Sequence, residues 1–127
     1  MKSRDSVLRL HKFQVREKTR QVTQIETMIG EFSRMAADLD AQILYEERKT
    51  GIDDPNHFAY STFAKAARAR RENLHTSAAD LKAQLGAAEA SLAEAEAELA
   101  KAERLEARDG KATVEEAPAV DRAMMIG

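Results

Sequence analysis

Apolar residues recur every seven positions through the first half of the chain, in two neighbouring rows. The first row holds Leu8, Val15, Val22, Ile29, Ala36 and Ile43. The second row, three residues later, holds His11, Lys18, Ile25, Phe32, Leu39 and Glu46. Two rows at this spacing form the buried stripe of a coiled coil. The pattern predicts one helix over about residues 3–49.

The second half repeats this pattern with more alanine. One row holds Tyr60, Ala67, Leu74, Leu81, Ala88, Ala95 and Ala102, and the other holds Ala64, Arg71, Ala78, Leu85, Leu92 and Leu99. Between the two halves, Gly51 is suited to end a helix, Asp54 to cap the next one and Pro55 to occupy its first position. We therefore predict a second helix and a turn at about residues 50–57.

Reversal of the chain at this turn brings the two sets of rows face to face. Leu8 then faces Leu99. Nearer the turn, Leu39 faces Ala67 and Ile43 faces Ala64, so that large residues tend to meet small ones. The sequence predicts an all-α fold, a long antiparallel two-helix coiled-coil hairpin over residues 1–108. The pattern stops after Arg108, and we expect residues 109–127 to form a flexible C-terminal tail.

The composition fits exposed helices better than a compact globule. The chain is 43% hydrophobic, 5% aromatic and 33% charged. It has no cysteine, so it contains neither a disulfide nor a thiolate ligand, and the cytoplasm is the expected compartment. We expect neither a secretion signal nor a membrane-spanning helix, because no apolar run is long enough.

Residue types that carry catalysis are present but are not grouped. His11, His57 and His75 lie far apart, and the five glycines form no phosphate-binding loop. A two-helix rod also has no deep pocket for a small-molecule substrate. We expect no metal, no cofactor and no enzymatic activity.

Two regions are candidates for protein contacts. At the turn end, the aromatic residues are Tyr45, Phe58, Tyr60 and Phe63, and a basic collar beside them consists of Lys65, Arg68, Arg70 and Arg71. At the terminal end, Leu10 and Phe13 lie off the buried stripe, with Arg9 and Arg16 beside them. Local packing and a solvated charged face are the alternative explanations, whereas aromatic anchors are frequent in interfaces.

Several segments resemble a known family. MKSRDSVLRLHKFQVREKTRQVTQIETMIGEFSRMAADLDAQI and TGIDDPNHFAYSTFAKAARARRENL are similar to the alphaproteobacterial branch of the FliJ flagellar export proteins. The resemblance covers most of residues 1–105. The turn segment Thr50 to Phe63 and the opening MKSRDS with LHKFQV carry it more specifically than the seven-residue repeats do.

The resemblance implies a stalk-like hairpin in the flagellar type III export apparatus, which serves motility and chemotaxis. Its partners would be the flagellar export ATPase, the membrane component of the export gate and export chaperones, and its location the cytoplasm at the inner membrane of the flagellar base. The region with Arg9, Leu10, Phe13 and Arg16 would meet the ATPase ring. The region from Phe63 to Leu74 would lie closer to the gate, but no gate-contacting side chain is assigned.

Two other functions remain compatible with the residues. One is a general coiled-coil scaffold that forms a helical bundle, with the alanine-rich face of residues 86–102 as a second seam. The other is binding of nucleic acid or an anionic membrane through residues 1–20, which carry seven Lys or Arg against two acids. Nucleic acid is not the expected partner.

Overall fold

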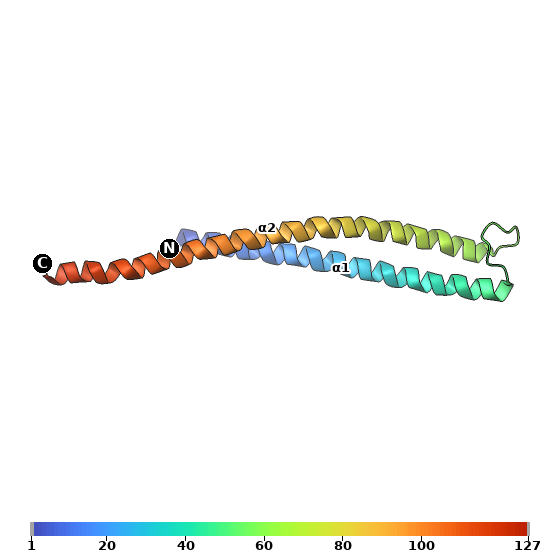
Figure 1. The fold of residues 1–127 in the computed structure, drawn as a ribbon, viewed down its shortest axis with the longest axis horizontal. Coiled ribbons are helices and arrows are strands. Elements are labelled where there is room, and N and C mark those ends of the chain that lie inside the picture. Colours follow the sequence, from blue (N-terminus) through green and yellow to red (C-terminus); the bar gives the residue numbers. More distant parts are fainter. Residues whose placement is uncertain (1, 127) are drawn as a thin grey trace. The chain divides into compact units, whose positions relative to one another are not determined.

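The protein consists of two long helices joined by one loop. The computed structural model describes the backbone of residues 2–126 and the side chains of residues 3–110. Helix α1 spans Lys2–Thr50 and helix α2 spans Thr62–Ile126 (Figure 1). No strand occurs in the described backbone. The predicted all-α helical hairpin is confirmed.

The helices divide into two compact units, which are described separately. The turn unit comprises residues 21–88, and the terminal unit comprises residues 1–20 together with residues 89–127. Each unit contains a stretch of α1 packed against a stretch of α2.

The core of the turn unit is thin and uses small residues on α2. Leu39 and Ile43 of α1 form a buried cluster with Ala67 of α2, and Leu74 packs against it. Ala64 is fully buried, at 0% exposure. Alanine on one helix lets the larger side chains of the other approach its backbone, so that the layers interlock without a void. This arrangement confirms the expected pairing of large with small residues.

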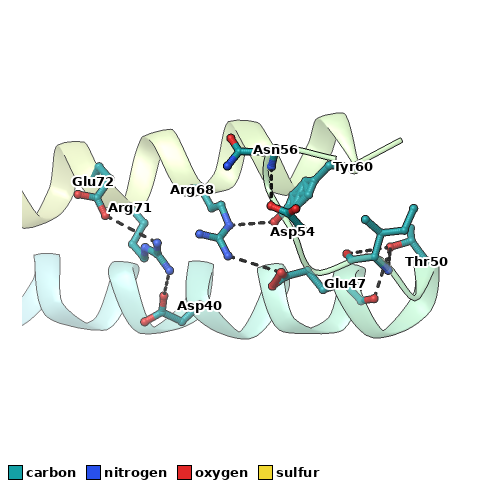
Figure 2. Close-up of polar contacts among 10 residues, drawn as sticks. Asp40, Glu47, Thr50, Asp54, Asn56, Tyr60, Arg68, Arg71 and Glu72 are labelled. Atoms are coloured by element: carbon teal, nitrogen blue, oxygen red, sulfur yellow. Dashed lines mark hydrogen bonds and ion pairs between the residues drawn. The ribbon is translucent and has the colours of Figure 1, made fainter. Parts of the chain in front are cut away.

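Polar contacts between the helices of the turn unit show that they run antiparallel (Figure 2). Asp40 contacts Arg71, and Glu47, one heptad later on α1, contacts Arg68, which precedes Arg71 on α2. Glu46 accepts a hydrogen bond from Ser61 at the start of α2. The contacts therefore join residues that lie closer together in sequence as they approach the loop.

The seven-residue rows match the burial of both units. In the turn unit the row positions are buried or half-buried, including Val22, Ile29 and Leu85. In the terminal unit Leu8, Val15, Leu92 and Leu99 are half-buried. The buried stripe is thus where the repeat predicts it, and the polar His11 and Lys18 of the second row are half-buried as well.

The first helix ends at the predicted glycine. Gly51 has φ 75°, a left-handed conformation that only glycine adopts without strain, and its N–H donates to the carbonyl of Glu47 over 2.9 Å. A side chain would be strained at this position whatever space surrounds it. Gly51 therefore fixes the point at which the chain leaves α1.

The prediction that Asp54 caps the second helix is wrong. The Asp54 carboxylate instead accepts the N–H of Asn56, and its carbonyl accepts the N–H of His57, which closes a turn within the loop. The cap of α2 is Ser61, whose hydroxyl accepts the N–H of Ala64 at 3.2 Å. The connection is therefore longer than expected and occupies residues 51–61.

Helix α2 continues beyond the predicted end at Arg108. Its backbone is helical to Ile126, and within the terminal unit it extends past the start of α1 (Figure 1). The tail expected over residues 109–127 lies almost entirely outside the residues whose side chains are described. Its flexibility stays a prediction.

Candidate protein-binding surfaces

The terminal unit exposes large apolar side chains on α1. Leu10 is 52% exposed and Phe13 is 51% exposed, and their three-residue spacing places them on one helix face. Arg9 and Arg16 are also exposed. The structure thus brings together the apolar and basic residues that the sequence indicated, and we call Arg9, Leu10, Phe13 and Arg16 the terminal patch.

A groove lies between the helices of the terminal unit. It is lined by Arg4, Val7, Ala102, Leu105 and Glu106. Val7 and Leu105 are each about half exposed, and Arg4 forms an ion pair with Asp109. Val7 and Leu105 were not predicted from the sequence, where Val7 directly precedes Leu8 of a buried row and Leu105 lies beyond the last residues of both rows.

Among the side chains described in the terminal unit, two polar atoms are buried and have no hydrogen-bond partner. They are Nδ1 of His11 and Oε2 of Glu106. Burial of an unsatisfied polar atom costs about 1–3 kcal/mol. The terminal unit is therefore less well stabilised on its own than a fully apolar stripe of the same length.

Replacement of His11 by leucine is expected to stabilise the protein. The change removes the unsatisfied nitrogen and adds apolar contact in the buried row, so the free energy of unfolding should rise by about 1–2 kcal/mol. Urea denaturation measures this. His75→Leu, at an exposed position of α2, is the control and should change stability by about 0.5 kcal/mol or less. Equal effects of the two variants would contradict the explanation.

The turn unit exposes three aromatic rings. Phe58 is 96% exposed, Tyr45 69% and Phe63 56%. Phe58 stacks on the imidazole of His57 with the ring centroids 4.8 Å apart. A groove beside the loop is lined by Ala41, Gln42, Tyr45, Glu46 and Phe63. Local packing within the described residues therefore leaves these three rings exposed.

Tyr60, the fourth aromatic residue of this end, is buried instead. Its exposure is 8%, and its hydroxyl accepts a hydrogen bond from Nε of Arg68 at 2.9 Å (Figure 2). This bond raises the pKa of Arg68, and Glu47 contributes in the same direction, so the guanidinium stays charged. Tyr60 and Arg68 therefore fasten the loop to the helices and present little surface to a partner.

The basic collar consists of two paired and two exposed residues. Arg71 reaches Asp40 at 2.9 Å and Glu72 at 3.7 Å, and Arg68 reaches Glu47 at 3.5 Å. Arg70 and Lys65 are exposed and have no ion pair with any described side chain. The position of Arg71 on the buried row is thus explained within the chain, and Arg70 and Lys65 are the collar charges open to a partner.

The described residues offer little for small-molecule chemistry. No group of three or more His, Asp or Glu side chains is placed to hold a metal ion within the described part of the chain. No helix there is apolar over a sufficient length to cross a bilayer. The features that stand out are exposed apolar and basic side chains, which suit contacts with proteins.

Comparisons with known proteins found no relative of this chain. No family model matches the chain, and searches of curated proteins and of solved structures found no significant match.

Proposed function

We propose that this chain is a non-enzymatic stalk of a flagellar type III protein export apparatus, which binds the ring of the export ATPase and promotes its assembly and activity. The observation that carries the proposal is the terminal patch on one unit of a helical hairpin, with Leu10 and Phe13 half exposed beside Arg9 and Arg16. The resemblance of the opening and loop segments to the FliJ proteins supplies the identity of the partner.

The chemistry of the terminal patch suits a ring-shaped protein partner. Leu10 and Phe13 supply apolar anchors, which gain most of their binding free energy when a pocket excludes water around them. The surrounding arginines favour an acidic rim on the partner and speed the encounter. A helical hairpin is narrow enough to enter a ring, because each helix is about 10–12 Å across.

The turn unit supplies the contacts expected toward the export gate and the export chaperones. Phe58, Phe63 and Tyr45 are its exposed aromatic anchors, and Arg70 adds an unpaired charge among the described residues. In this proposal the protein works at the cytoplasmic face of the inner membrane, held there by its partners.

Hydrolysis of ATP by the cognate export ATPase, measured with and without this chain, tests the proposal. We expect faster hydrolysis, more assembled rings by electron microscopy, and no hydrolysis by the chain alone. A folded helical chain that leaves both the rate and the ring count unchanged would contradict the proposal.

A further inference from the structure

The two sides of the turn unit differ in chemistry. On one side, called the paired flank, Asp40 and Glu47 of α1 meet Arg71 and Arg68 of α2 (Figure 2). Asp40 and Glu47 lie seven residues apart, on the α1 row that directly follows buried Leu39 and half-buried Glu46 in sequence. The charges of this flank are therefore satisfied within the chain.

The other side, called the open flank, has an uncharged α1 row. This row holds Gln21, Met28, Met35 and Gln42, and the α2 row beside it holds Phe63, Arg70, Ser77 and Gln84. Met28 is 42% exposed and Met35 is 47% exposed. The groove lined by Gln42, Tyr45 and Phe63 shows that the α1 and α2 rows share this side.

The shape of the open flank suits a helix as its partner. A coiled-coil helix carries side chains every seven positions and can lie along both rows of the flank. Exposed methionine is adaptable in shape and common on helix-binding surfaces. The open flank is therefore a suitable surface for another helix.

The charges at its edge point to the partner. The α1 row at the edge holds Glu31, Asp38 and Tyr45, and the α2 row holds Arg70. None of these three charged residues forms an ion pair with another described side chain. Acids on α1 and a base on α2 are complementary when α1 of one hairpin lies over α2 of another.

The register of the hairpin supports the same arrangement. The pairing that places Ala36 opposite Arg71 puts Arg70 at the level of Ala37. Asp38 lies one residue from that level, about 1.5 Å along the helix axis, and Glu31 lies about 9 Å away on its other side. With a two-fold axis parallel to the helices, Arg70 of a second copy would therefore lie between these two acids.

We propose that a second copy of this chain packs on the open flank to form a two-fold dimer, a four-helix bundle with both loops at the same end. Met28, Met35 and Phe63 of each copy form its apolar centre, and Arg70 of each copy pairs with Glu31 and Asp38 of the other. This contact does not use the terminal patch, but it covers Phe63 and Arg70, so the dimer and a contact of these two residues with the export gate exclude each other.

The available area is sufficient for a specific dimer. From Gln21 to Tyr45 the flank is about 36 Å long, and two helices side by side are about 20 Å wide. The contact would bury about 1,400 Å² in total, which is within the usual range for specific complexes. In a two-fold dimer, each favourable charge pair is also formed twice, once in each direction across the contact.

Sedimentation velocity over a range of concentrations tests the dimer. We expect the wild-type chain to pass from monomer to dimer, and Met28→Lys with Met35→Lys to raise the dissociation constant about a hundredfold, because four charges enter the apolar centre. Thr27→Lys is the matched control, since Thr27 is exposed on a different row of α1. A wild-type chain that stays monomeric while folded overturns the proposal and assigns the open flank to a helix of another protein.

Charge reversal tests the cross-chain pairs. Arg70→Glu alone and Glu31→Lys with Asp38→Lys alone should each weaken self-association about tenfold or more, because like charges then meet. A mixture of the two variants should form mixed dimers, since both pairs are restored with reversed sign. A mixture that associates no better than either variant overturns the arrangement. ATPase stimulation should be unchanged in the variant with Glu31→Lys and Asp38→Lys, because neither residue has a part in the proposed function, and this separates the contact from that function.

Discussion

Replacing Ile43 with alanine lowers the free energy of unfolding by about 3 kcal/mol, the cost typical of truncating a buried isoleucine. Ile43 is 3% exposed and belongs to the cluster with Leu39 and Ala67. The turn unit has a thin core, so few neighbours can move to fill the space that the truncation leaves. Thermal or urea denaturation followed by circular dichroism at the helix signal measures the loss.

Leu44→Ala is the matched control for this prediction. Leu44 is the next residue of α1 and is 48% exposed, so its truncation should cost about 0.5 kcal/mol or less. Equal losses for the two variants would mean that the row containing Ile43 does not face α2. The comparison therefore tests the register of the hairpin as well as its stability.

Truncation of both Leu10 and Phe13 to alanine raises the concentration needed for half-maximal stimulation of the export ATPase about a hundredfold, if each anchor contributes about 1–2 kcal/mol to binding. Both side chains are half exposed in the isolated chain, so their loss should not reduce helicity. Titration of ATP hydrolysis with the variant, together with its circular dichroism spectrum, measures both effects.

Leu44→Ala with Phe58→Ala is the control for the terminal patch. It removes the same two residue types from exposed positions of the turn unit. Stimulation should remain at the wild-type level. If this control loses as much stimulation as the terminal variant does, the ATPase does not distinguish the two units and the assignment of the terminal patch fails.

The hairpin could be predicted from the sequence because its buried stripe repeats over many turns. Each additional heptad is further evidence that the same helix face is buried. Leu8 and Ile43 therefore belong to one repeat although they lie far apart in sequence. The end of α1 could also be predicted from the sequence, since Gly51 supplies the left-handed conformation that a helix end requires. Periodicity and one special residue were sufficient for the fold.

The details of the loop could not be predicted because several residues compete for the same roles. Asp54 and Ser61 are both good caps, and the hydrogen bond from Ser61 to Glu46 across the hairpin, which no local pattern reveals, accompanies the choice of Ser61. Burial of Tyr60 also depends on a residue of the next helix, Arg68. Tertiary contacts of this kind decide loop structure more than local preference does.

The candidate protein-binding surfaces could be predicted only in part from the sequence. Leu10 and Phe13 stood out because they are apolar yet off the stripe, and the structure exposes both. Met28 and Met35 did not stand out, because they adjoin the stripe and look like part of it. Exposure on a two-helix hairpin depends on whether a third helix is present, and a single sequence gives no direct sign of that.

Site-specific photo-crosslinking to the export ATPase tests the central claim most directly. A photoreactive residue is introduced in place of Phe13 in the terminal unit or in place of Phe58 in the loop, and each protein is irradiated with the assembled ring. We predict cross-links to the ATPase from the position of Phe13 and none from the position of Phe58. Cross-links from the loop position alone, or from neither position, would contradict the account.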